Sequence, residues 1–140
     1  MPERNAVITV VHEWVTKAES DLRAAVYLLE PRVEPPTEAV CYHAQQCAEK
    51  YVKALLVFRG ADFPKTHDIE KLAALLPATL RPGLTLEEHR RFIAYATAAR
   101  YPGWGEIPLA EARRAVALAR RVRKEIRRAL PRETLRRKKR

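Results

Sequence analysis

Residues 39–60 constrain the fold most, because their apolar side chains recur at helical spacing over the whole stretch. One apolar row repeats at steps of four and three residues and consists of Val40, Ala44, Cys47, Tyr51, Ala54 and Phe58. A second row lies beside it and consists of Cys41, Ala48, Val52, Leu55 and Leu56. One neighbouring helix cannot cover a surface of this width. The pattern therefore predicts a long central helix surrounded by several others.

A polar row runs along the same predicted helix. His43, Gln46 and Lys50 follow one another at i, i+3 and i+7, and Glu49 and Lys53 have the i, i+4 spacing of a helical ion pair. Two interpretations of this row remain open. The row lines a ligand-binding groove, or His43 and Gln46 hydrogen-bond a neighbouring helix while Lys50 lies in solvent.

The chain before the central helix predicts a first helix over residues 10–30. Its apolar positions keep helical spacing and are Val11, Trp14, Val15, Ala18, Leu22, Ala25 and Leu29. Pro31 ends this helix, because proline has no N–H group to continue the hydrogen-bond pattern. Thr37, or the prolines before it, starts the central helix, and Gly60 ends it.

Two shorter helices are predicted after the central one. Thr66 is the expected N-cap of a helix that ends near Leu76, and Asp68 suits the positive end of that helix. Thr85 and Glu88 have the spacing of a capping box and start a helix that ends near residue 100. The predicted inner face of this second helix consists of Leu86, Phe92, Ile93, Ala96 and Ala99.

The C-terminal part predicts an aromatic turn, a long helix and a tail. Residues 101–108 read YPGWGEIP and favour an ordered turn. The helix from Pro108 onward has a predicted inner face of Leu109, Ala112, Val116, Ala119, Ile126 and Leu130. Residues beyond Pro131 are expected to form a mobile tail.

These segments predict an all-α protein, an antiparallel helical bundle of about five helices. The expected organisation is a single domain over residues 1–130 followed by a basic tail over residues 131–140. Because the central helix is apolar around much of its circumference, we expect a second copy of the chain to cover part of the surface and form a homodimer.

Positive charge is concentrated at the C-terminal end. Residues 1–110 contain 13 Lys and Arg against 14 Asp and Glu, whereas residues 111–140 contain 14 against 3. Such a block suits a polyanion such as RNA or an acidic protein surface, and it also suits stability and solubility in a heat-adapted protein. The basic tail proposed to contact nucleic acid consists of Arg136, Arg137, Lys138, Lys139 and Arg140.

The composition argues against membrane insertion, secretion and cofactor chemistry. No apolar run approaches the length that spans a bilayer, and the first residues lack the features of a secretory signal, so a cytoplasmic protein is expected. Cys41 and Cys47 are six residues apart on one helix, about 9 Å along its axis, which is too far for a disulfide. His43 and Cys47 supply at most two metal ligands, so no metal and no cofactor are expected.

Four segments together resemble a known family. They are WVTKAESDLRAAVYLLE at 14–30, YHAQQCAEKYVKALLVFRG at 42–60, PKTHDIEKL at 64–72 and ARYPG at 99–103. In this order and spacing they resemble the HEPN domain (higher eukaryotes and prokaryotes nucleotide-binding) over nearly the whole chain. The resemblance implies an all-helical bundle that commonly dimerises and associates with nucleotides or RNA. In prokaryotes it also implies a frequent pairing with a separate minimal nucleotidyltransferase as a toxin and antitoxin.

The ribonuclease motif of that family is not evident. Ribonuclease members carry an arginine and, after four to six intervening positions, a histidine. The nearest arginine–histidine pairs here have seven residues between them and are Arg4 with His12, Arg59 with His67 and Arg81 with His89. Arg100 has no histidine after it. No catalytic residue is therefore assigned, and nuclease activity is not expected from this motif.

Three functions remain as hypotheses. In the first, a groove receives the phosphate and base of a nucleotide or RNA through His43, Lys50, Lys53, His67, Arg100 and Tyr101. The second is a metal-independent endoribonuclease whose site is completed across a dimer. The third is a non-catalytic module whose basic helix docks an acidic partner. For Arg100 and Tyr101 the alternative is an aromatic plug at a helix end.

Overall fold

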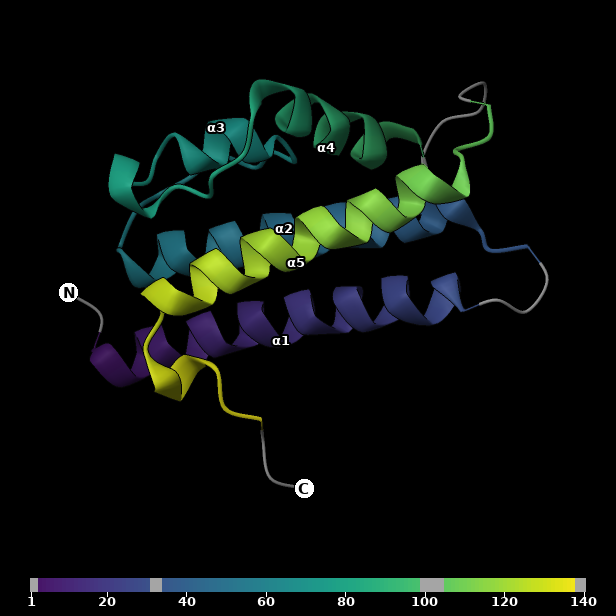
Figure 1. Cartoon of the computed structure of the whole chain (residues 1–140). Coiled ribbons are helices and arrows are strands. Elements are labelled where there is room, and N and C mark those ends of the chain that lie inside the picture. Colours follow the sequence, from purple (N-terminus) through teal and green to yellow (C-terminus); the bar gives the residue numbers. More distant parts are fainter. Residues whose placement is uncertain (1–2, 31–33, 99–104, 138–140) are drawn as a thin grey trace.

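The computed structural model describes residues 3–30, 34–98 and 105–137, and every regular element among these residues is helical (Figure 1). The α-helices are α1 (Arg4–Leu29), α2 (Thr37–Phe58), α3 (Ile69–Ala73), α4 (Leu86–Ala98) and α5 (Leu109–Ala129). Two short 3₁₀ helices are η1 (Ala78–Leu80) and η2 (Arg132–Thr134). The predicted all-α bundle of five helices is confirmed.

Helix α2 lies at the centre of the bundle. The long helices α1, α2 and α5 lie along one another, with α1 running opposite to α2 and α5, and the shorter α3 and α4 form a layer on the side away from α1 (Figure 1). Both predicted apolar rows of α2 are buried, apart from Phe58, which is partly buried against the core. The width of that apolar surface explains why α2 needs neighbours on several sides.

Local capping signals fix several helix ends. Gly60 follows the last turn of α2 with φ of 71°, a left-handed conformation that glycine adopts without a Cβ penalty. Thr85 and Glu88 form the predicted capping box, in which each backbone N–H donates to the other side chain. The N-cap of α3 is Asp68 and not Thr66: Asp68 accepts a hydrogen bond from the backbone N–H of Lys71.

Two predicted boundaries differ from the structure. Helix α1 begins at Arg4, six residues before the predicted start, because Val7 still packs on the core. The tail expected from residue 131 is not free over residues 131–137. There η2 follows α5, Thr134 is buried, Leu135 packs on the core, and His12 Nε2 lies 2.5 Å from the carbonyl oxygen of Arg136.

Three residues predicted to face inward are instead largely exposed. Leu86, Ile93 and Leu109 have relative exposures of 54%, 42% and 37%. On α4 the buried side chains are Phe92, Tyr95, Ala96 and Ala98, so this helix is rotated relative to the predicted face. Residues 99–104, including Ala99 and the first four residues of the aromatic turn predicted at 101–108, lie outside the described residues.

Candidate functional site

The polar row of α2 is organised by two nearly buried carboxylates. Asp21 comes from α1 and has a side chain 11% exposed, and Glu49 comes from α2 itself and has a side chain 3% exposed. A buried carboxylate is costly unless cations or N–H donors surround it. Both have such partners, and the partners include four of the residues that the sequence assigned to ligand binding.

Asp21 holds His43 and Lys50 from α2. His43 Nδ1 lies 2.9 Å from Asp21 Oδ1, and Lys50 Nζ donates to Asp21 Oδ2 at 2.5 Å. When Nδ1–H donates to the carboxylate, the imidazole is fixed with a lone pair on Nε2. The His43 side chain is 32% exposed, so Nε2 belongs to a ring that solvent and ligands reach.

Glu49 holds Lys53, His67 and Gln45. Lys53 Nζ donates to Oε2 at 2.9 Å, His67 Nδ1 lies 2.9 Å from Oε1, and Gln45 Nε2 donates to Oε1 at 3.1 Å. Burial raises the pKa of Glu49, but the hydrogen bonds from Lys53, Gln45 and His67 outweigh it, so the pKa lies below its ordinary value. Glu49 therefore stays ionised.

The loop after α2 closes this second cluster. Gln45 also donates to the backbone carbonyl of His67 at 3.0 Å, which ties the loop to α2. Lys53 Nζ lies 5.6 Å from the ring centre of Trp14 and 5.8 Å from that of Phe63, within the range of cation–π attraction. The side chain of Lys53 is only 11% exposed, whereas that of His67 is 48% exposed.

The structure thus places four predicted site residues in two separate clusters on or against α2. His43 and Lys50 share Asp21, and Lys53 and His67 share Glu49. The two lysine charges are balanced by the two carboxylates, so this surface is less cationic than the sequence suggested. Arg100 and Tyr101 lie outside the described residues, as do Lys138, Lys139 and Arg140 of the tail; Arg136 and Arg137 are described and exposed.

Asp21 and Glu19 are the residues that sequence reasoning missed. Asp21 lies seven residues after Trp14, on the same side of α1 and next to the buried Leu22, a signal of a carboxylate directed at a neighbouring helix. Glu19 joins all three long helices. Its Oε1 accepts hydrogen bonds from Tyr51 at 2.5 Å, from Arg123 at 2.8 Å and from Arg127 at 3.0 Å.

A fourth carboxylate, Glu111, joins α5 to α4. It accepts hydrogen bonds from Tyr95 and Arg91, and Arg91 also pairs with Glu87. Burial raises the pKa of Glu111, and the bonds from Tyr95 and Arg91 lower it further than burial raises it. Together with Glu19, this residue shows that much of the polar chemistry at the seams of the bundle holds helices together.

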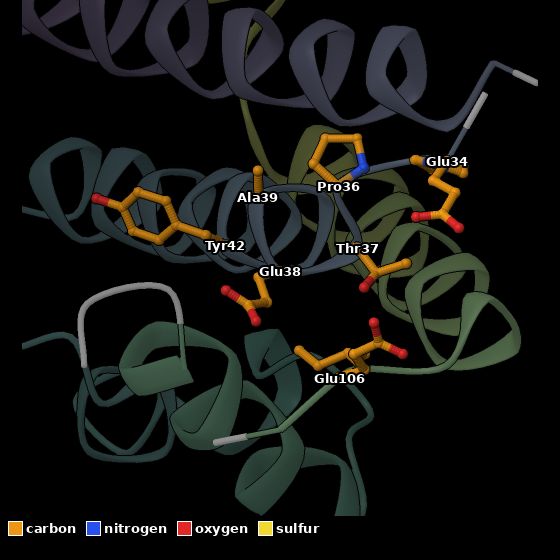
Figure 2. A pocket seen from close by; sticks show the side chains of 9 residues that line it. Glu34, Pro36, Thr37, Glu38, Ala39, Tyr42 and Glu106 are labelled. Atoms are coloured by element: carbon orange, nitrogen blue, oxygen red, sulfur yellow. The ribbon is translucent and has the colours of Figure 1, made fainter. Parts of the chain in front are cut away.

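A separate cleft at the other end of α2 from the Glu49 cluster is lined by carboxylates, which disfavour a phosphate ligand. This cleft of about 520 Å³ lies at the N-terminus of α2 (Figure 2). The described residues that line it are Glu34, Pro35, Pro36, Thr37, Glu38, Ala39, Tyr42, Glu106 and Ile107. Glu38 and Glu106 project into the space between α2 and the segment before α5 (Figure 2). None of the predicted ligand-binding residues that the structure describes lines it, and the three carboxylates among its described lining residues repel a phosphate.

The cysteines offer neither a nucleophile nor a metal site. Cys41 and Cys47 are buried free thiols, and burial raises the pKa of Cys41 to about 12. Within the described residues no three His, Cys, Asp or Glu side chains come together as metal ligands do. Nor does any helix in the described part of the chain have the length and apolar character that crossing a membrane requires.

With the helical bundle and its α2 clusters established, comparison with known proteins decides the family. The family model described as HEPN domain matches residues 11–129. The chain belongs to the HEPN domain family. The matched region of the HEPN domain begins inside α1 and ends with α5, so it contains both the Asp21 and the Glu49 clusters.

Two similar proteins extend this assignment. A crystal structure of ST0689, an archaeal HEPN homologue, is 27% identical and has a TM-score of 0.62, covering 85% of this chain and 96% of that one. The "Putative toxin MJ1304" of Methanocaldococcus jannaschii is 42% identical over 50 residues. That match covers 36% of this HEPN chain and 31% of the M. jannaschii protein, so it spans about a third of each.

Proposed function

We propose that this HEPN domain is the toxin-like member of a toxin–antitoxin pair and that it binds RNA or a nucleotide. In this proposal it works in the cytoplasm as a homodimer, together with a separate minimal nucleotidyltransferase. Family membership supports the assignment, as does similarity over 50 residues to the protein named "Putative toxin MJ1304". The observation that carries ligand binding is the partial exposure of His43 and Lys50 on α2 and of His67 in the loop after it, each held by a nearly buried carboxylate.

The two carboxylates position these groups. Asp21 and Glu49 each hold a histidine through Nδ1, which directs the opposite edge of each ring away from the carboxylate. Lys50 then donates hydrogen bonds to a phosphate, the Nε2 lone pair of His43 accepts a hydrogen bond from a base or ribose group, and the exposed edge of His67 supplies a third contact. Lys53 supports the site by holding Glu49. Arg100 and Tyr101 stay in the proposal on their sequence alone.

Replacing His43 and His67 together by alanine is expected to weaken RNA or nucleotide binding about tenfold to a hundredfold, since each hydrogen bond contributes about 0.5–1.5 kcal/mol. Fluorescence anisotropy with labelled RNA, and calorimetry with ATP, measure the affinities. The matched control replaces the exposed Lys17 and Arg23 of α1, where no change is expected. A wild-type protein that binds neither ligand at 50 mM salt would contradict the proposal.

A second function, metal-independent cleavage of RNA, is favoured by the Asp21–His43 pair. Nε2 of His43 would take the proton of a ribose 2′-OH, the 2′-oxygen would bond to phosphorus, and the bond from phosphorus to the 5′-oxygen would break. The 5′-oxygen would take a proton from water, and the hydroxide left behind would take the proton back from His43. Arg100 of a second copy would stabilise the phosphorane charge.

Cleavage is tested by incubating the protein with total RNA in EDTA. If His43 is the base, His43→Gln should slow cleavage at least a hundredfold and leave the melting temperature within a few degrees of wild type. Intact RNA after long incubation at high protein concentration excludes this second function and leaves the binding proposal in place.

A further inference from the structure

The cations of α5 divide into an engaged set and a free set. In the engaged set, Arg114 pairs with Glu111, Arg121 donates to Glu88 and to the carbonyl of Gly83, and Arg123 and Arg127 donate to Glu19. The free set is exposed and has no hydrogen bond or ion pair to any other residue that the structure describes. It consists of Arg113, Arg120, Lys124 and Arg128.

The free set forms a straight stripe. Its members are separated by steps of seven, four and four residues, and such steps return to nearly the same side of a helix with 3.6 residues per turn. From residue 113 to residue 128 the stripe is about 22 Å long at 1.5 Å per residue. The opposite side of α5 is buried, so the stripe points outward.

The acidic residues of α5 do not neutralise the stripe. Glu111 is held on the α4 side of the helix by Arg91 and Tyr95, and Glu125 accepts a hydrogen bond from the backbone N–H of Gly83. Four positive charges therefore stand in a row without counter-charges among the described residues. Such a row attracts a polyanion by releasing condensed counterions.

We propose that this stripe binds the phosphate backbone of a nucleic acid, independently of sequence. The outer side of α5 carries no Asn, Gln or aromatic side chain, the groups that read or stack on bases. Large apolar side chains are also missing there, apart from Leu109 at the first turn, although a protein interface needs a desolvated apolar centre. Exposed cations alone contact the phosphate backbone of a nucleic acid and do not read its bases.

This inference rests on the proposed function in taking RNA as the ligand, but it places most of the electrostatic attraction on α5 and not on α2. The α2 clusters are charge-balanced, whereas the stripe is not. If the stripe binds RNA, the affinity should depend strongly on salt concentration. Binding through the α2 histidines should depend on it only weakly. The two sites can therefore be tested apart from each other.

The test measures anisotropy of labelled single-stranded RNA and DNA of equal length and mixed sequence from 50 to 200 mM KCl. Four phosphate contacts change the slope of log affinity against log salt by about 2.8, or about 50-fold in affinity over this range. The variant R113Q/R120Q/K124Q/R128Q is expected to lose that part of the slope and to bind at least tenfold more weakly at 50 mM. RNA and DNA should behave alike.

The matched control removes four exposed cations from other surfaces: Lys17, Arg23, Lys71 and Arg90, each changed to glutamine. Circular dichroism melts check that both variants fold. An equal loss in the two variants would mean that binding follows net charge alone and would overturn the stripe. Binding of RNA but not of DNA would also overturn the stripe. Tight binding of polyglutamate without binding of RNA would overturn it as well, because that result would assign the stripe to an acidic protein.

The outcomes also separate this inference from the proposed function. Wild-type protein that binds no RNA contradicts both. The stripe alone is contradicted if the stripe variant keeps the wild-type salt slope while replacing His43 and His67 lowers the affinity for RNA. Loss of the slope in the stripe variant with no effect of the histidines supports the stripe and contradicts the α2 site.

Discussion

Replacing Glu49 by leucine is expected to destabilise the protein by about 3–5 kcal/mol, because the substitution leaves the charge of Lys53 in the bundle without its partner. Both side chains are nearly buried, and the bonds from Gln45 and His67 to the carboxylate are lost as well. Chemical denaturation followed by circular dichroism measures the free energy of unfolding. The rings beside Lys53 offset only part of the loss.

A second substitution isolates the cause. In E49L/K53L no unpaired charge remains, so the double variant should be more stable than E49L alone. If the two substitutions acted independently, adding K53L would not restore stability. Glu87→Leu is the matched surface control: Glu87 also pairs at i, i+4, with Arg91, but its side chain is 73% exposed and its loss should cost at most about 1 kcal/mol. An E49L protein as stable as wild type would show that Lys53 escapes to solvent.

The central helix could be predicted from the sequence because its evidence is local. Helical periodicity places Cys47 and Leu55 on buried surface without knowledge of what packs there, and both are buried. The capping box at Thr85 and the ion pair between Glu49 and Lys53 also depend only on residues three or four positions apart, and both are confirmed.

The partners of the polar row could not be predicted, because they come from other helices. Asp21 is 29 residues from Lys50, and Glu19 is 104 residues from Arg123. Which of these groups meet depends on how the helices are rotated about their axes. Helical periodicity shows which side of a helix is buried, but it does not show which residues of another helix pack against that side. The same reason explains α4, where the exposed Ile93 has the helical spacing of an inner residue.

The N-cap of α3 shows a different limit of prediction from the sequence. Thr66 and Asp68 both suit an N-cap, and the sequence favoured Thr66. In the structure the Thr66 hydroxyl accepts a hydrogen bond from the backbone N–H of Asp68, and Asp68 caps α3. The tie between Gln45 and the carbonyl of His67 holds the loop at this point, so a contact distant in sequence determines where the helix starts.

Acid is expected to unfold the protein through the carboxylates that join its helices. Burial raises the pKa of Glu19, but the bonds from Tyr51 and Arg123 lower it by more, and the pKa values of Glu49 and Glu111 are also lowered. A group whose folded pKa lies below its unfolded value of 4.5 stabilises the fold above that pH. Its contribution is lost as the pH falls through the folded pKa.

The free energy of unfolding should therefore be nearly constant just above pH 5 and should fall steadily below about pH 4.5, as urea titrations at successive pH values would show. Glu19→Gln should lower stability at neutral pH and make the acid decline shallower, because one proton-linked group is gone. Glu87→Gln, at an exposed position, should leave the curve unchanged. Stability that rises toward acid pH, or an E19Q curve parallel to wild type, would mean that Glu19 does not hold the three long helices together through its charge.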